Sequence, residues 1–140
     1  MKPFFTVIIP TYNRAELLRR ALESVHSQTY RDFEVIVCDD GSTDHTRDVA
    51  NSFAGRMHMS YLRDENWGGP ARPRNRGIQE ASGEWLCFLD ADDWWYPEKL
   101  AAVFALTSGV DVVLCDDIRS GCIGRDRFTK ERGERQYPRN

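Results

Sequence analysis

Three carboxylates, Asp90, Asp92 and Asp93, stand within four residues, directly after the apolar run from Trp85 to Leu89. Carboxylates this close repel one another and lose hydration on burial, so the end of a strand does not collect them for stability alone. Oxygen-only clusters of this kind suit a hard divalent cation, Mg²⁺ or Mn²⁺. We therefore expect Asp90, Asp92 and Asp93 to be metal ligands, and the ion to bring a phosphate-bearing ligand with it.

Polar clusters also follow the three preceding apolar runs of the sequence. They are Thr11 to Asn13, Asp39 to Ser42, and Asp64 to Asn66. In open α/β sheets, ligands bind outside the carboxyl ends of the strands. The four clusters together therefore predict one ligand site at that edge of a sheet.

The pair Asp39 and Asp40 precedes Gly41 and Ser42, which suit a turn into a helix. We expect one of the two carboxylates to cap that helix, which leaves the other free to accept a hydrogen bond from a base or a ribose hydroxyl. Tyr12 could stack on a nucleobase, and ordinary packing is the alternative.

Three arginines, Arg72, Arg74 and Arg76, lie between the Gly68-Gly69 turn and Gly77. A guanidinium can grip a phosphate with two hydrogen bonds. With spacings of two residues the three cannot all point the same way, so we expect one or two at most to reach a ligand. A solvent-exposed basic helix face is the alternative. The aromatic run from Trp94 to Tyr96 could form a sugar platform or pack in the core.

Apolar and β-branched runs predict five strands, at residues 4–10, 33–38, 59–63, 85–89 and 110–115. Helical spacing predicts helices between them. Asn13 is the expected cap of the first helix, and Ser42 or Thr43 of the second, whose apolar face is Val49, Ala50 and Phe53. A third helix runs towards Ala81, and Pro97 opens a fourth. This alternation predicts an α/β fold with a mostly parallel sheet flanked by helices on both faces.

Composition and charge suggest two regions, a domain over residues 1–118 and a basic tail over residues 119–140. The tail carries seven basic and three acidic residues, so its charge is +4 and that of residues 1–118 is −7. We expect a poorly ordered, solvated tail. Contact with nucleic acid, an anionic membrane or a phosphate ligand is the alternative. A nucleic-acid partner is disfavoured because the core is acidic and no aromatic residues punctuate a basic face.

Four cysteines without paired metal spacing suggest reduced thiols. No apolar stretch approaches the ~20 residues of a membrane span, and no signal peptide precedes the first strand. We expect a cytoplasmic protein, either free or at the inner face of a membrane.

Four motifs in order give the chain a strong resemblance to glycosyltransferase family 2, the inverting nucleotide-sugar transferases with the Rossmann-like GT-A fold. The motifs are Val7 to Arg14, Val37 to Asp44, Asn66 to Gly77, and Leu89 to Asp93 with Pro97.

The resemblance implies transfer of a sugar, with inversion, from a nucleoside diphosphate sugar such as a UDP-sugar to a saccharide, lipid-linked or other hydroxyl acceptor. It implies Tyr12 against the base, Asp40 reading the edge of the base, and Arg72 or Arg74 near the nucleotide. Asp90 and Asp92 would serve ribose and a Mn²⁺ or Mg²⁺ ion, with Asp93 as an extra metal ligand. The full expected donor-binding set is Pro10, Thr11, Tyr12, Asn13, Asp39, Asp40, Arg72, Arg74, Asp90, Ala91 and Asp92.

The resemblance also implies that the catalytic base and the acceptor pocket belong to a C-terminal half, so the chain looks truncated and its base is unassigned. Asp116 and Asp117 do not match the usual base motif. The alternative function is therefore a non-catalytic nucleotide-binding half-domain, completed by a missing C-terminal part, by a partner or in an oligomer.

Overall fold

The computed structural model describes residues 2–115 and 128–129, and its centre is a four-stranded parallel sheet. The strand order is β3-β2-β1-β4, and each neighbouring pair is parallel. The bounds are β1 Phe5–Thr11, β2 Phe33–Asp39, β3 Met59–Arg63 and β4 Trp85–Phe88. The first four predicted strands and the mostly parallel sheet are thereby confirmed.

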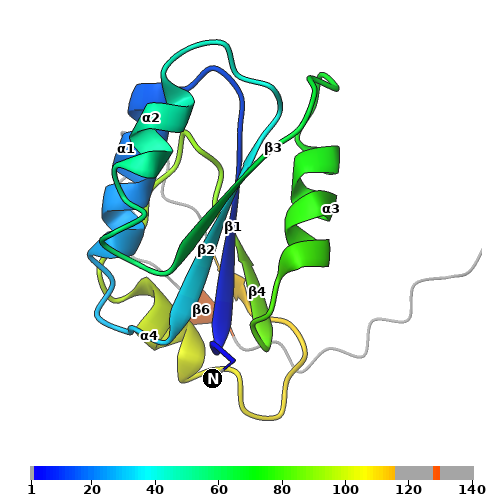
Figure 1. The fold of residues 1–140 in the computed structure, drawn as a ribbon. Helices are drawn as coiled ribbons and strands as arrows, with labels where there is room; N and C mark the ends of the chain where they lie inside the picture. The colour runs from blue at the N-terminus through cyan, green and yellow to red at the C-terminus, as the bar shows by residue number, and fades with distance from the viewer. Residues whose placement is uncertain (1, 116–127, 130–140) are drawn as a thin grey trace, which may run out of the picture.

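Helices cover both faces of this sheet, as the alternation of elements predicts (Figure 1). α1 and α2 lie on one face, and α3 lies on the opposite face. Right-handed crossovers between parallel strands produce this arrangement. The bounds are α1 Ala15–His26, α2 Thr46–Asn51, α3 Ala71–Glu80 and α4 Lys99–Phe104. None of the described helices is long and apolar enough to cross a membrane.

The two faces of the sheet carry cores of very different size. The α1 side holds the larger cluster, which includes Val7, Leu22 and Phe53, all essentially inaccessible to solvent. Among the residues that the structure describes, the α3 side holds the small cluster of Ile8, Ile36 and Cys38. α3 packs there through Gly77, where an added Cβ would lie 2.6 Å from Ile8 Cγ2. The position of α3 therefore depends on the absence of a side chain at Gly77.

The fifth predicted strand, Val110 to Cys115, is wrong in extent and in place. Only Leu114–Cys115 forms a strand, β5, which pairs antiparallel with β6, Phe128–Thr129, outside the parallel sheet. Residues 110–113 are irregular, and Val112 is two-thirds exposed. An apolar run forms a strand only where a neighbouring strand offers hydrogen-bond partners to its backbone. The local amino-acid composition does not show whether such a neighbour is present.

The predicted caps of the first two helices are also wrong. Asn13 adopts a left-handed conformation, with φ of 48°, and its side-chain oxygen accepts hydrogen bonds from the backbone N–H groups of Thr43 and Asp44. Asp44 in turn accepts from Ala15 N at 3.1 Å and from Thr46 N at 3.0 Å, which are the first residues of α1 and α2. A side-chain oxygen from each of the loops after β1 and β2 therefore accepts hydrogen bonds from the other loop. Asp44 accepts from the first backbone N–H group of both α1 and α2.

The predicted basic tail, residues 119–140, lies outside the described residues except for the two residues of β6. Asp116 and Asp117 lie outside them as well.

Candidate functional site

The carboxyl ends of the parallel strands bring the polar clusters of the sequence to one edge of the sheet. Thr11 is the register partner of Asp39, and Asp39 is that of Arg63. The loop after β4 lies at the same edge, because β4 pairs in parallel with β1.

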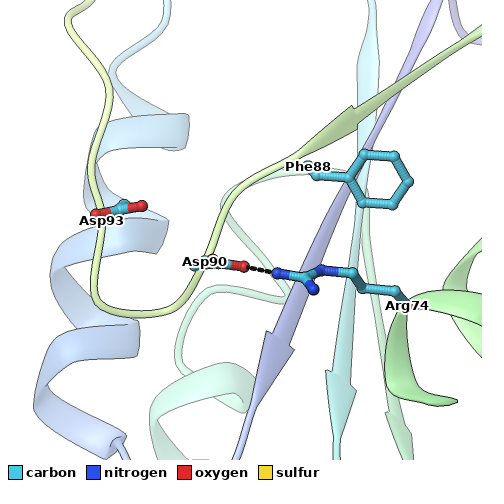
Figure 2. A pocket seen from close by; sticks show the side chains of 4 residues that line it. All are labelled: Arg74, Phe88, Asp90 and Asp93. Atoms are coloured by element: carbon cyan, nitrogen blue, oxygen red, sulfur yellow. Dashed lines mark hydrogen bonds and ion pairs between the residues drawn. The ribbon is translucent and has the colours of Figure 1, made fainter. Parts of the chain in front are cut away.

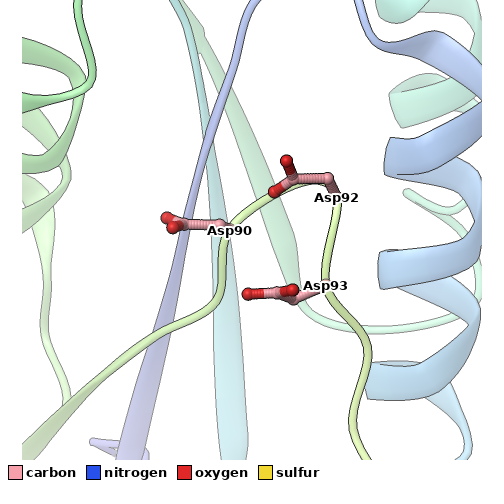
Figure 3. Close-up of side chains that lie close together, drawn as sticks. All are labelled: Asp90, Asp92 and Asp93. Carbon is pink, nitrogen blue, oxygen red and sulfur yellow. The ribbon is translucent and has the colours of Figure 1, made fainter. Parts of the chain in front are cut away.

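Asp90, Asp92 and Asp93 form a compact group of carboxylates on that loop. One oxygen from each lies within 4.8 Å of the others, and the three side chains project to the same side of the loop (Figure 3). Asp90 is half-buried, whereas Asp92 and Asp93 are exposed. Three oxygens this close, with open space for further ligands, fit a hard octahedral cation such as Mg²⁺ or Mn²⁺. The donor chemistry of the group thus agrees with the expected metal site.

A pocket of about 390 Å³ opens beside the carboxylates and is lined by Arg74, Phe88, Asp90 and Asp93. Arg74 reaches from α3 and forms an ion pair with Asp90 (Figure 2). The pocket therefore combines a cationic guanidinium, two carboxylates and the half-exposed ring of Phe88. Such a mixture can hold a phosphate between a bound cation and an arginine.

Of the three arginines in the α3 segment, Arg74 is the one that lines this pocket. The guanidinium of Arg72 lies 3.7 Å from the ring centroid of the exposed Trp67, which is a cation–π contact. Arg76 lies 3.5 Å from both Asp64 and Glu80. The expectation that one or two of the three reach a ligand agrees best with Arg74, and the role of Arg72 stays a prediction.

Asp39 is almost completely buried and is surrounded by protein donors. Its Oδ1 accepts from Ser42 N at 2.9 Å and from the Ser42 hydroxyl, and its Oδ2 accepts from Tyr61. Arg63 lies 4.0 Å away. Burial, with the hydrogen bond to Asp39, raises the pKa of Tyr61 and keeps its hydroxyl protonated as a donor. These contacts fix the turn after β2, and a contact of Asp39 with the donor stays a prediction.

Asp40 holds the loop between β3 and α3. Its two oxygens accept from Trp67 N at 3.0 Å and Gly68 N at 3.1 Å. The expectation that Asp39 or Asp40 caps the next helix is therefore wrong, because the backbone N–H of Thr46, the first residue of α2, donates to Asp44 instead. Each oxygen of Asp40 has one further lone pair, so the proposed contact with a base remains chemically open.

Thr11, the last residue of β1, and Tyr12, which follows it, have contrasting surroundings. Tyr12 is 45% exposed, as a ring available for stacking must be. Thr11 is 5% exposed, and its Oγ1 has no hydrogen-bond partner among the residues that the structure describes. A buried hydroxyl without a partner is costly, so a ligand or a water molecule is expected to complete it. The other two residues in the expected set, Pro10 and Ala91, are both buried beside this edge of the sheet.

Trp94, Trp95 and Tyr96 divide between the two alternatives for that run. Trp95 packs against the large core, and its backbone N–H donates to Ser24. Trp94 and Tyr96 are each 45% exposed and form an edge-to-face pair at 5.0 Å. They do not line the pocket of Arg74 and Asp90.

Arg14 is a residue beside the site that the sequence interpretation did not assign, as is Phe88 of the pocket lining. Arg14 forms an ion pair with Asp92, across 78 residues of sequence. The signal available was its place in the Val7 to Arg14 motif, but the sequence does not show that the loop after β4 crosses over the start of α1.

Comparison with known proteins assigns the family. The profile of glycosyl transferase family 2 matches residues 6–139, and the chain belongs to this family, as the motifs indicate. It is 44% identical over 110 residues to a validoxylamine A glucosyltransferase from Streptomyces hygroscopicus subsp. jinggangensis, which covers 76% of this chain and 26% of the relative. It is also 44% identical over 106 residues to a PGL/p-HBAD biosynthesis glycosyltransferase from Mycobacterium bovis, covering 74% of this chain and 41% of the relative.

Solved structures of similar fold confirm the GT-A-like architecture. Residues 1–349 of TarS from S. aureus, in complex with UDP, superpose with a TM-score of 0.72 at 35% identity, covering 74% of this chain and 31% of that one. The mannosyltransferase PcManGT from Pyrobaculum calidifontis, in complex with GDP-Man and Mn²⁺, gives 0.71 at 32% identity, with 78% and 34% covered. The chain thus spans about a quarter to two fifths of the length of these relatives.

Proposed function

We propose that this chain binds the donor in the transfer of a sugar from a nucleoside diphosphate sugar to an acceptor hydroxyl. The observation that carries the proposal is the group of Asp90, Asp92 and Asp93 beside Arg74, at the carboxyl edge of the sheet. Carboxylates for a cation and an arginine for a phosphate are the two recognition elements that a diphosphate requires. Two of the similar structures contain UDP and GDP-Man, which supports this ligand class.

Within this proposal, Asp92 would hold a Mn²⁺ or Mg²⁺ ion with help from Asp90 and Asp93. The bound ion would supply positive charge to the diphosphate leaving group. Arg74 orients the same group from α3, Tyr12 stacks on the base, and Asp40 accepts from its edge. We favour UDP over other nucleotides as the carrier of the sugar. We also favour inversion as the stereochemical outcome, because the acceptor hydroxyl would attack from the face opposite the diphosphate.

Calorimetric titration with UDP and GDP, each with and without Mn²⁺, tests the donor assignment. We expect UDP to bind in the presence of Mn²⁺, and Asp92→Ala to abolish the Mn²⁺-dependent part. Asp111→Ala removes an exposed carboxylate elsewhere on the chain and serves as the matched control. Unchanged Mn²⁺-dependent binding in Asp92→Ala contradicts the site, and tighter binding of GDP than of UDP contradicts the choice of base.

A second candidate function is nucleotide binding without turnover. It is favoured by the residues that the described part of the chain brings together, because Asp90, Asp92, Asp93 and Arg74 account for donor binding and none of them is assigned as the catalytic base. Donor hydrolysis and sugar transfer by the purified chain separate the two candidates. Sustained turnover would exclude the binding-only function, whereas tight binding with no turnover would favour it.

A further inference from the structure

Arg14 is anchored by its two neighbours in the chain. Asn13 N donates to Ser42 Oγ at 2.8 Å, and Ala15 N donates to Asp44 Oδ2 at 3.1 Å. Both acceptors belong to the loop after β2, so the backbone at Arg14 is held between two hydrogen bonds. Because the backbone at Arg14 is held in place, the positions that its guanidinium can occupy depend on rotation about its own side-chain bonds.

The ion pair between Arg14 and Asp92 is poorly suited to a purely structural role. Both side chains are 48% exposed. Ion pairs this open to water contribute little to stability, because solvent screens them and both long side chains lose rotamer freedom. Within the described part of the chain, a divalent ion competing for Asp92 therefore faces a weak partner in Arg14.

Two arginines on different elements form ion pairs with the group of Asp90, Asp92 and Asp93. Arg74 approaches Asp90 from α3, and Arg14 approaches Asp92 from the start of α1. A dication among the same carboxylates repels a guanidinium at contact distance. A diphosphate bound at that ion would offer Arg14 a new anionic partner in place of Asp92, because a guanidinium can bind a phosphate with two hydrogen bonds.

We propose that Arg14 is an exchangeable positioning residue, which neutralises Asp92 in the free protein and contacts the donor diphosphate once a cation occupies the carboxylates. This inference rests on the proposed function. It makes cation and nucleotide binding cooperative through one side chain, because the ion releases the guanidinium that the diphosphate needs. By linkage, the nucleotide must then tighten cation binding by the same factor.

The exchange predicts opposite changes in two affinities when Arg14 is replaced. In Arg14→Gln, Mn²⁺ alone should bind roughly two- to five-fold more tightly, which is the range expected for losing a competing exposed ion pair. UDP in saturating Mn²⁺ should bind about ten-fold more weakly or worse, as expected for a lost charge-assisted hydrogen bond. If the ion pair only joined the start of α1 to the loop after β4, its loss in Arg14→Gln would loosen the site. The affinities for Mn²⁺ and for UDP would then both fall.

The experiment measures Mn²⁺ binding by electron paramagnetic resonance without nucleotide, and UDP binding by calorimetry at saturating Mn²⁺. Arg19→Gln is the matched control, since it removes the same charge from α1, at a side chain that pairs with Glu16. Tighter Mn²⁺ with weaker UDP in Arg14→Gln alone supports the exchange.

Equal changes in Arg14→Gln and Arg19→Gln, or affinities that fall together, overturn the exchange while the proposed function stands. If the parent chain binds no UDP at any Mn²⁺ concentration, the proposed function and the diphosphate contact both fall. The Mn²⁺ titration then still decides whether Arg14 competes for Asp92.

Discussion

Replacing Gly77 by alanine should push α3, and Arg74 with it, away from the sheet. The new Cβ would lie 2.6 Å from Ile8 Cγ2 and 2.9 Å from Cys38 Sγ. Comfortable contacts between such atoms begin at ~3.5 Å, so the nearer one falls short by about 0.9 Å. Both neighbours are buried in the small core under α3 and cannot turn aside. The helix must therefore move.

The expected cost follows from two opposing effects. Alanine in place of glycine favours a helix interior by about 1 kcal/mol. Forcing a methyl group into a packed interface costs roughly 1–3 kcal/mol, and two contacts this short place Gly77→Ala at the upper end. We expect a net loss of about 2 kcal/mol, or a fall of roughly 6–10 °C in the melting temperature.

Thermal unfolding of the parent, Gly77→Ala and Gly55→Ala measures this effect. Gly55 is the matched control, because an added Cβ there meets no atom within 4 Å. Gly55→Ala should melt within a few degrees of the parent, on the order of 0.5 kcal/mol. Cys38→Ala combined with Gly77→Ala should recover part of the loss, since the pair shares one contact. A Gly77→Ala protein that melts at or above the parent would refute the packing argument.

Two further predictions concern buried polar groups away from the site. Gln28 is fully buried and links α1 to α4 by accepting from Leu100 N at 2.9 Å and donating to Tyr96 O at 2.7 Å. Gln28→Leu leaves Leu100 N without its acceptor and Tyr96 O with only the hydrogen bond from Lys99 N at 3.0 Å. It should cost about 1–3 kcal/mol in urea unfolding, and a loss below ~0.5 kcal/mol would mean that the link is unimportant. Burial raises the pKa of Glu34, but hydrogen bonds from Thr6 and Ser82 outweigh it and lower the pKa below 4.5. A lowered folded pKa stabilises the protein above the unfolded value, so the advantage of the parent over Glu34→Gln should be full at pH 7 and shrink as the pH falls below 4.5. An advantage that grows on acidification would show that the sign is wrong.

The parallel sheet was predictable because its strands are encoded locally. β1 and β2 are buried along their whole length, and their near-continuous apolar runs are typical of central parallel strands. The edge strand β3 was also found at its observed bounds, Met59 to Arg63, directly before the polar cluster from Asp64 to Asn66. Residues 110–113 carry a similar apolar signal and pair with no strand within residues 2–115 and 128–129.

The candidate site was predictable in residue type and in place, but not in its pairings. The carboxylates after β4 and the arginines of α3 are visible in the sequence. The partner of each was not, because Arg14 and Asp92 are 78 residues apart, and only the packed fold brings them together. The same holds for Asp40, whose neighbours suggest a helix cap and whose oxygens instead hold the backbone at Trp67 and Gly68.

The side-chain oxygens of Asn13 and Asp44 each accept hydrogen bonds from the backbone of the other's loop, so the loops after β1 and β2 form one structural unit. A residue inserted into either loop would disturb the start of both α1 and α2, since Asp44 serves the two helices. An engineer who transplants one of these loops from a relative to change nucleotide preference should therefore expect misfolded protein. Residues 13–15 and 42–46 carry the hydrogen bonds between the side chains and backbone of the two loops, so they should be moved together.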